Sequence, residues 1–457
     1  MYIKEAITKL GTLVELKGWV FNSRSSGSIA FIQFRDGSGN IQIIAEKKAF
    51  DEKKWEEIKS LTLESSVIVK GKIREEKRSP FGYEMDLTDL TIVQLSDLSY
   101  PVQKKEHGPE FLLDNRHLWL RSQSQIDLMR IRYQVKQAIY EYFDKEGFLN
   151  IDSPILTPNA CEGSTTLFKV PYTPSWSDET ISDMENVKMT EGGFETKDGT
   201  KLPTAFLSQS GQLYIEAAIY AHGKVYDFGP TFRAEKSKTR RHLTEFWMMD
   251  AEMAYHTHKD NLDVQEGLVK HIIARCLKNC EAELKNLGRD TTILKNSVEK
   301  PFARIEHKEA IAMLQKDGIK IGDRDDLGAE EEAILTKKFD TPIFVQRYPK
   351  EIKAFYMKED PSDPTRVLNA DLLAPEGVGE IIGGSEREDS YDKLKARMEK
   401  EGLSMDEYGW YLDLRRYGSI PHSGFGIGIE RTVRWISGTE HIRECIPFPR
   451  MINRITP

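Results

Sequence analysis

The sequence of 457 residues predicts an α+β protein, in which a small N-terminal β-barrel precedes a larger domain built on an antiparallel sheet flanked by helices. Two observations predict this class. Residues 13–95 contain short runs with the alternation of strands, whereas from Ile126 apolar residues recur at helical spacing. The composition, 39% hydrophobic and 30% charged, is that of a globular chain long enough for two or three domains.

Residues 1–95 are predicted to form the barrel. Asp36-Gly-Ser-Gly39 is a hairpin signal between the second and third strands, and Lys47–Ser60 is predicted to be one helix after the third. Five strands with a helix after the third are typical of the OB-fold, a small Greek-key barrel. The predicted strands cover residues 14–20, 29–35, 41–44, 67–73 and 90–93.

Residues 96–125 are predicted to be a linker because they combine proline, glycine and mixed charges. The pattern then changes to a long amphipathic helix over Ile126–Phe143, and Phe148–Ile151 is predicted to be a strand that stops at Ser153-Pro154. On its sequence alone, the long helix is one more core helix.

The larger domain is predicted to cover residues 126–457. Residues 170–205 are polar and rich in proline and glycine, which predicts an irregular insertion. Residues 306–339 are predicted to be a helical insertion. Strands, and then a final helix, are expected over residues 342–457.

Composition favours a cytoplasmic protein without a membrane partner. No apolar run approaches the roughly 20 residues of a membrane helix, and the N-terminus has no apolar run of signal-peptide length. Four scattered cysteines do not make a disulfide framework, so a reducing compartment is expected. The net charge of −8 does not suggest RNA binding, but a local basic patch can still bind RNA.

Two separated motifs predict a nucleotide site. The first is Phe228–Glu235, followed by a basic loop over 236–241 and by Glu245-Phe-Trp247. Its arginine supplies positive charge for phosphates, and Phe246 supplies a flat face for a base. If Thr231–Glu235 is a strand, Arg233 and Glu235 share one face. Taken singly, that pair also fits a structural ion pair.

The second motif is Gly424-Phe-Gly-Ile-Gly-Ile-Glu-Arg431. Three glycines at every second residue would leave one face of a strand bare, with room for a base, although such a repeat is also common at tight packing sites. Arg431 is expected to open the following helix.

Together these motifs resemble motifs 2 and 3 of the class II aminoacyl-tRNA synthetases, and the rest of the chain resembles their asparaginyl/aspartyl branch. The helix, strand and proline over residues 126–154 resemble motif 1, which forms the dimer interface in that family. The resemblance therefore implies a class II catalytic domain and a homodimer. It covers nearly the whole chain and is most specific at residues 228–253 and 369–446.

The resemblance implies ATP and Mg²⁺ as cofactors. Arg233 and Arg431 match the catalytic arginines, which contact the α-phosphate and the γ-phosphate. Asp371 and Glu380 match the metal carboxylates, although two acids alone also fit a solvated surface. The residues that match the ATP site are Arg233, Glu235, Arg241, His242, Phe246, Glu380 and Arg431.

The resemblance also implies an amino-acid pocket that takes L-asparagine. Aspartyl enzymes typically carry lysine at the position of Ile215 and glutamine at that of Glu216. An acid at 216 would accept from an asparagine amide and repel an aspartate carboxylate, if Gln212, Ile215 and Glu216 share one face of a helix that Ser210 caps. The residues that match the pocket are Glu162, Ser210, Gln212, Glu216 and Arg387.

In the barrel, Arg24, Phe31 and Gln42 match the positions that contact the anticodon, which implies tRNA(Asn) as the partner. A phenylalanine in an alternating strand is otherwise a core residue. Three alternatives stay open: an aspartyl-specific or non-discriminating synthetase, a tRNA-independent asparagine synthetase, and a non-catalytic RNA-binding relative. The retained Arg233, Glu235, Glu380 and Arg431 argue against the last.

Overall fold

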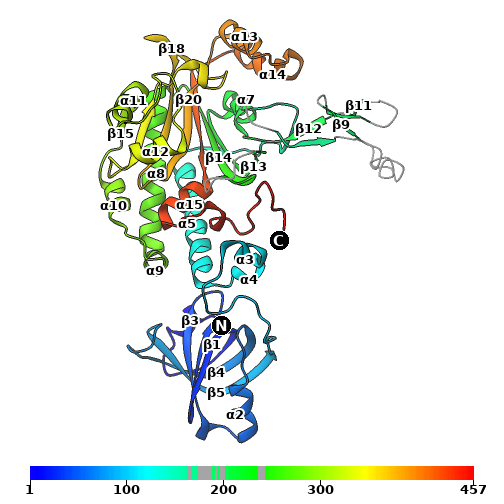
Figure 1. The fold of residues 1–457 in the computed structure, drawn as a ribbon, viewed down its shortest axis with the longest axis vertical. Coiled ribbons are helices and arrows are strands. Elements are labelled where there is room, and N and C mark those ends of the chain that lie inside the picture. The colour runs from blue at the N-terminus through cyan, green and yellow to red at the C-terminus, as the bar shows by residue number, and fades with distance from the viewer. Residues whose placement is uncertain (162–166, 172–187, 191–192, 196–200, 203, 235–241) are drawn as a thin grey trace. The chain divides into compact units, whose positions relative to one another are not determined.

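The computed structural model describes residues 1–161, 167–171, 188–190, 193–195, 201–202, 204–234 and 242–457. The chain forms two compact units, residues 1–115 and 116–457 (Figure 1). Each unit has its own hydrophobic core. Within the described part of the chain, every helix is too short or too polar to span a bilayer.

The first unit contains a closed barrel of five strands, which confirms the predicted fold of this region. The strand order is β1-β2-β3-β5-β4, and every neighbouring pair is antiparallel except β3 and β5. The strands are β1 (Leu13–Ser26), β2 (Ile29–Arg35), β3 (Asn40–Glu46), β4 (Ser65–Glu75) and β5 (Tyr83–Gln94), and the helices of this unit include α1 (Ile3–Ala6) and α3 (Pro109–Asp114).

The prediction of one helix over Lys47–Ser60 was wrong. The segment forms a short 3-10 turn, η1 (Lys47–Ala49), and then helix α2 (Glu52–Lys59). Phe50 between them is extended, and the Asp51 carboxylate accepts from the Lys54 backbone N–H at 2.7 Å. An aspartate N-cap therefore restarts the helix here, because it satisfies one of the free N–H groups of the first turn.

The second unit is built on an eight-stranded sheet of order β15-β16-β19-β20-β21-β14-β13-β6. Its six central strands are antiparallel, as predicted, whereas each edge strand pairs in parallel with its neighbour. The strands are β6 (Leu149–Asn150), β13 (Lys224–Phe232), β14 (Glu245–Ala254), β15 (Ala303–Glu306), β16 (Ile343–Gln346), β19 (Asn369–Ala374), β20 (Gly379–Glu386) and β21 (His422–Gly428).

Three helices, α5, α8 and α15, share one core with the central strands. Ile131 and Val135 of α5, Ile272 of α8 and Val433 of α15 are all buried with Ile427 of β21. The helices are α4 (Arg116–Trp119), α5 (Gln123–Lys145), α7 (Gln212–His222), α8 (His258–Asn279), α9 (Glu281–Asn286), α10 (Thr292–Glu299), α11 (His307–Lys316), α12 (Ala329–Thr336), α13 (Tyr391–Lys400), α14 (Met405–Arg416) and α15 (Ile429–Ser437), with 3-10 turns η3 (Lys350–Ile352) and η4 (Ile442–Glu444).

Strands lie within one region that was predicted as an insertion and directly before another, whose predicted helical character is confirmed by α11 and α12. The described parts of residues 170–205 are not irregular, and strand β15 precedes the predicted helical segment 306–339 and joins the edge of the main sheet. Short strands with few apolar residues give little periodicity, so the sequence did not reveal them. The small sheets contain β7 (Leu156–Thr157), β8 (Lys169–Pro171), β12 (Thr204–Leu207); β9 (Lys188–Thr190), β10 (Gly193–Glu195), β11 (Lys201–Leu202); and β17 (Glu359–Asp360), β18 (Asp363–Val367).

Candidate active site

A cavity lies between the β13–β14 hairpin, β20, β21 and the start of α15. Arg233 directly follows β13, and its backbone N–H donates to the Thr244 carbonyl at 3.0 Å, which extends the pairing of the hairpin by one residue. The Arg233 guanidinium carbon lies 5.3 Å from the centre of the Phe246 ring. A cation and a flat aromatic face thus stand side by side at this cavity.

The structure brings five of the predicted ATP residues together at this one cavity, whereas Glu235 and Arg241 lie outside the described residues. The expected strand over Thr231–Glu235 ends at Phe232, so Arg233 follows the strand rather than lying within it. The five residues that line the cavity are Arg233, His242, Phe246, Glu380 and Arg431.

Arg431, in the first turn of α15, is fixed by Glu380 of β20. Its Nη1 donates to the Glu380 carboxylate Oε2 and to the Glu380 carbonyl, both at 3.0 Å. Burial raises the pKa of Glu380, but Arg431, Lys353 and Arg233 together outweigh burial and leave the pKa below its usual value. The Glu380 carboxylate therefore stays ionised near neutral pH.

The three glycines of β21 differ in what lies next to them. A methyl group at Gly424 would lie 2.0 Å from Oε1 of Glu252, and one at Gly426 would lie 2.4 Å from Oδ1 of Asp250. Gly428, in contrast, faces open space. The expectation that all three make room for a base was therefore incomplete, because two of them also make room for buried carboxylates.

Asp371 and Glu380 converge on Gly383. A methyl group there would lie 3.1 Å from Oε1 of Glu380 and 3.7 Å from Oδ1 of Asp371. Lys353 Nζ lies 2.8 Å from Oδ2 of Asp371 and 4.0 Å from the centre of the Tyr348 ring. Burial raises the pKa of Asp371 to about 6, with Glu380 adding to the shift and Lys353 opposing it.

This pair offers hard oxygen ligands to a cation. Among the described residues, no group of three or more histidines, cysteines, aspartates or glutamates forms a protein-only metal site. Mg²⁺ usually takes only one or two carboxylates and completes its shell with phosphate oxygens and water. Asp371 and Glu380 fit that requirement.

A larger cavity adjoins the first and shares Arg233, Met248, Glu380 and Gly426 with it. Two predicted amino-acid residues, Ser210 and Gln212, line this cavity at the start of α7, and Arg387 lines it at the end of β20. Glu162, the predicted ligand of the α-ammonium group, lies outside the described residues. The two cavities thus form one continuous site with arginines at both ends.

Ser210 organises the start of α7. Its hydroxyl donates to Oδ2 of Asp250 at 2.7 Å and accepts from the Gln212 backbone N–H at 3.1 Å, while the Gly211 N–H donates to the same Asp250 oxygen at 3.0 Å. The predicted capping role of Ser210 is therefore present as a hydrogen bond, although Gly211 occupies the N-cap position itself.

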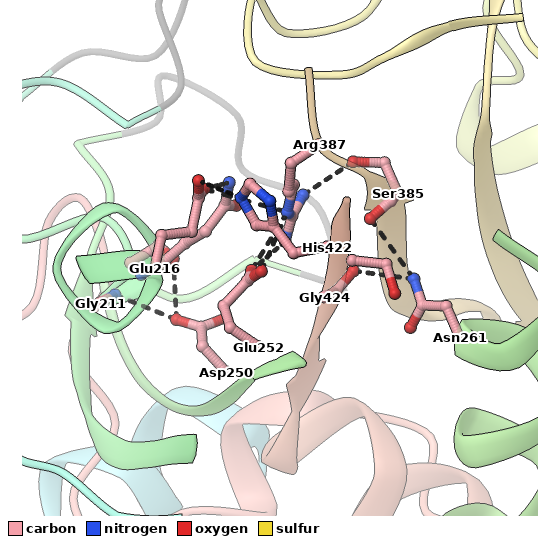
Figure 2. Close-up of polar contacts among 12 residues, drawn as sticks. Gly211, Glu216, Asp250, Glu252, Asn261, Ser385, Arg387, His422 and Gly424 are labelled. Carbon is pink, nitrogen blue, oxygen red and sulfur yellow. Dashed lines mark hydrogen bonds and ion pairs between the residues drawn. The ribbon is translucent and has the colours of Figure 1, made fainter. Parts of the chain in front are cut away.

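Arg387 is held by side chains from two strands. Its Nη1 donates to the Ser385 hydroxyl at 2.7 Å, its Nε donates to Oε1 of Glu252 at 3.1 Å, and its Nη2 also bonds to Glu252 (Figure 2). Burial raises the pKa of Glu252 to about 8, against the opposing charge of Arg387. The arginine is thus fixed at the edge of the cavity with a carboxyl group behind it.

Glu216 lies behind the cavity wall rather than in it. Its carboxylate is fully buried and accepts from Gln212 Nε2 at 3.0 Å, from the Tyr411 hydroxyl at 2.8 and 2.7 Å, and from Arg415 Nη2 at 2.7 Å. Burial raises the pKa of this carboxyl, but Arg415, His422 and Arg387 outweigh burial and hold the pKa well below its usual range.

Ile215 does not face the cavity, contrary to the expectation that it shares a functional face with Gln212 and Glu216. It is fully buried in an apolar cluster with Ile219 and Val225. Helical spacing places Gln212, Ile215 and Glu216 on one side of α7. That side contacts both the polar network around Glu216 and strand β13.

Two of the predicted anticodon residues, Arg24 and Phe31, lie on the outer surface of the barrel. Arg24 and Phe31 are cross-strand partners, and the Arg24 guanidinium carbon lies 4.9 Å from the centre of the half-buried Phe31 ring. Its neighbours in the strand, Ala30 and Ile32, point into the core instead. Gln42 is buried on the next strand, and its Nε2 donates to Oε1 of Glu84 at 2.7 Å.

Comparison with known families decides what this architecture is. Residues 108–452 match the family of tRNA synthetases class II (D, K and N), and residues 14–93 match the OB-fold nucleic acid binding domain. The chain belongs to the class II tRNA synthetases.

Individual relatives of this synthetase are similar over nearly their full length. It is 50% identical to the asparagine–tRNA ligase of Symbiobacterium thermophilum over 454 residues, which cover 98% of this chain and 97% of the relative. It is also 50% identical to the asparagine–tRNA ligase of Streptococcus sanguinis, over 98% and 97% of the two chains. The solved asparaginyl-tRNA synthetase of Pyrococcus horikoshii, complexed with asparaginyl-adenylate, is 43% identical with a TM-score of 0.90, over 100% and 99% of the two chains.

Sequence reasoning missed four charged residues of this candidate site. Asp250 and Glu252 had a usable signal, because two acids at alternate positions of an otherwise apolar strand must share one buried face. Lys353 and Arg415 had none, because each is brought to the site by contacts distant in sequence.

Proposed function

We propose that the chain acts as an asparagine–tRNA ligase: it activates L-asparagine with ATP to asparaginyl-adenylate and transfers the acyl group to the 3′ end of tRNA(Asn). The observation that carries this proposal is the continuous site. Arg233, Phe246 and Arg431 stand at one end and Arg387 at the other, in a chain half identical to asparagine–tRNA ligases throughout its length.

The chemistry of the first step needs position and charge rather than a base. The carboxylate of the amino acid is already ionised, so it can attack the α-phosphorus in line without losing a proton. Arg233, beside the junction of the two cavities, is suited to the charge that develops on the α-phosphate, and Phe246 to the adenine ring. Arg431 is suited to bind the γ-phosphate, because Glu380 holds the Arg431 guanidinium in the wall formed by β20 and the start of α15.

Mg²⁺ is part of this proposal. Asp371 and Glu380 would hold the ion, which would supply positive charge to neutralise the phosphates. Support for the assignment comes from the convergence of the two carboxylates over Gly383 and from the raised pKa of Asp371, which an added cation would lower. Lys353 supplies part of that positive charge in the protein alone.

Arg387 is the proposed ligand of the side chain of asparagine. Its guanidinium lines the larger cavity and can donate to the carbonyl oxygen of an amide, while Ser210 and Gln212 line the same cavity from α7. Glu162 remains the proposed ligand of the α-ammonium group. Glu216 is no longer proposed to touch the substrate, because Gln212, Tyr411 and Arg415 already surround its carboxylate.

The outer barrel surface is the proposed anticodon site. Phe31 offers a half-exposed ring for stacking on an unpaired base, with the Arg24 guanidinium beside it. Gln42 can read a base edge only if it exchanges its bond to Glu84 for one to RNA.

We further propose a cytoplasmic homodimer. The motif 1 elements, α5 and β6, leave Tyr133 of the helix 56% exposed and Leu149 of the edge strand 46% exposed. An edge strand with exposed apolar residues favours pairing with another chain. All four cysteines, which belong to the described residues, are buried thiols rather than disulfides, which suits a reducing compartment.

The experiment is amino-acid-dependent ATP–pyrophosphate exchange, run in parallel with asparagine and with aspartate, together with aminoacylation of tRNA(Asn) and light scattering. We expect exchange with asparagine, charging of tRNA(Asn) and the mass of a dimer. Exchange with aspartate alone would identify an enzyme that activates aspartate: an aspartyl-tRNA synthetase if tRNA is also charged, and a tRNA-independent asparagine synthetase if it is not. No exchange at all would leave the RNA-binding relative.

A further inference from the structure

Arg415 reaches the substrate site from outside the main sheet. It belongs to α14, the second helix of the α13–α14 hairpin, and its side chain is completely buried. Its Nη2 lies 2.7 Å from Oε2 of Glu216, and its Nε donates to the Glu388 carbonyl at 2.9 Å. The guanidinium carbon also lies 4.3 Å from the centre of the Tyr411 ring. These contacts fix the position of a full positive charge next to the amino-acid pocket.

Two carboxylates compete for the arginine that lines the pocket. Arg387 bonds to Glu252, and its Nε lies 3.9 Å from Oε1 of Glu216 as well. Glu216 is not drawn closer, because Arg415 and the Tyr411 hydroxyl occupy its oxygens. If Arg415 were absent, the arginine nearest to the Glu216 carboxylate would be Arg387, and His422 Nε2, 3.1 Å from Oε2 of Glu216, would also remain beside it.

We propose that Arg415 is a positioning residue for asparagine: by pairing with Glu216 it leaves Arg387 aimed at the pocket, and the balance between the charges of Arg415 and Glu216 keeps the pocket from gaining the positive charge that would favour a carboxylate over a neutral amide. This inference rests on the proposed function and adds to it a residue that does not touch the substrate. In place of direct contact between Glu216 and the substrate, the paired charges of Glu216 and Arg415 act from behind the cavity wall.

The charge balance predicts opposite effects for the two partners. Removing Glu216 leaves Arg415 uncompensated, and this extra positive charge favours an aspartate carboxylate. Removing Arg415 leaves Glu216 uncompensated, which repels aspartate further and pulls Arg387 away from asparagine. Removing both side chains removes one negative and one positive charge, so the net charge behind the cavity wall returns to that of the wild type. A purely structural role would instead weaken asparagine and aspartate alike in every variant.

The test measures kcat and KM for asparagine and aspartate in pyrophosphate exchange with Glu216→Gln, Arg415→Met, the double variant and Arg415→Lys. We expect Glu216→Gln to lower the asparagine/aspartate ratio of kcat/KM by about tenfold. Arg415→Met should raise KM for asparagine by about tenfold and should not lower the ratio. The double variant should return toward the wild-type ratio, the lysine variant should recover part of the loss, and KM for ATP should stay within about twofold.

The control is Arg416→Met, which removes the neighbouring arginine of the same helix. Arg416 is exposed and stacks on Tyr417, so this variant should behave as wild type. A ratio that moves in the same direction in both single variants, or that does not recover in the double variant, overturns the inference. If Arg415→Met does not fold, comparison of Glu216→Gln with the double variant decides. A wild-type protein that does not activate asparagine would refute the proposed function instead.

Discussion

Phe31 and Phe34 lie three residues apart on strand β2 and face opposite ways, so they provide a matched test of the proposed anticodon surface. Phe34 is fully buried in the barrel core, whereas Phe31 is half-buried on the outer surface beneath Arg24. We expect Phe31→Ala to impair aminoacylation while it spares adenylate formation, because the substitution removes a stacking surface and leaves the catalytic unit unchanged.

The two substitutions should differ in kind. Phe34→Ala removes a ring from a closed core and should lower the free energy of unfolding of the barrel by about 3–5 kcal/mol. Phe31→Ala should cost less, because the Phe31 ring is only half-buried and its contact with the Arg24 guanidinium contributes about 0.5–1 kcal/mol. Its effect on tRNA should be larger, because base stacking on an aromatic ring contributes about 1–3 kcal/mol, or roughly 5- to 150-fold in kcat/KM for tRNA.

One preparation of each variant should be measured by pyrophosphate exchange, by aminoacylation and by thermal melting. The expected result for Phe31→Ala is a normal exchange rate, a loss confined to kcat/KM for tRNA, and a melting temperature close to that of wild type. A melting temperature lowered as far as that of Phe34→Ala, with no selective tRNA defect, would refute the proposal that Phe31 faces RNA.

The remaining predictions concern the catalytic unit. Arg233→Ala should cost about 2.7–4 kcal/mol of transition-state stabilisation, by analogy with removal of an oxyanion donor, and a wild-type single-turnover adenylation rate in the folded variant would contradict its role. Lys353→Met removes the ammonium group that competes for Asp371, so the half-saturating Mg²⁺ concentration in exchange should fall; an unchanged or higher value argues against metal binding there. Burial raises the pKa of Asp227, the cross-strand partner of Asp250, to about 8 and the pKa of Asp250 to about 6, so the stability that their bound protons contribute is lost as pH rises from about 4 to 8. Asp227→Asn should flatten this dependence, whose limit is about 1.4 kcal/mol per pH unit for one proton, when unfolding is followed by denaturant from pH 5.5 to 8.5; an equal slope in the variant would contradict the raised pKa.

The sequence predicted the barrel well because alternation is clear in strands such as β2. Ala30, Ile32 and Phe34 fill the core while Phe31 and Gln33 between them face outward, so the pattern of two is visible without any structure. It also predicted the residues that bring charge to the nucleotide cavity, because these cluster in two short motifs.

The sequence did not predict where a side chain lies when its position depends on tertiary contacts. Helical spacing placed Ile215 beside Glu216, but it could not say that an apolar cluster would take one and a buried polar network the other. Arg415 lies 199 residues beyond Glu216, and α14 carries several other charges that face solvent. Nothing in the local pattern separates the one arginine of the pair Arg415–Arg416 that is buried from the one that is exposed.

The glycine repeat of β21 and the acids of β14 are one feature divided between two strands. Gly424 is the cross-strand partner of Glu252, and Gly426 is the partner of Asp250. Each carboxylate occupies the space that a side chain on β21 would fill, since a methyl group at either glycine would lie within 2.4 Å of a carboxylate oxygen. A buried acid needs hydrogen-bond partners. Because β21 carries no side chain at these two positions, Arg387 can reach Glu252 and Ser210 can reach Asp250. The motif that resembles a nucleotide cradle therefore also holds open the polar wall of the larger cavity, which places the proposed adenylate chemistry and the proposed side-chain selection at opposite ends of the same pair of strands.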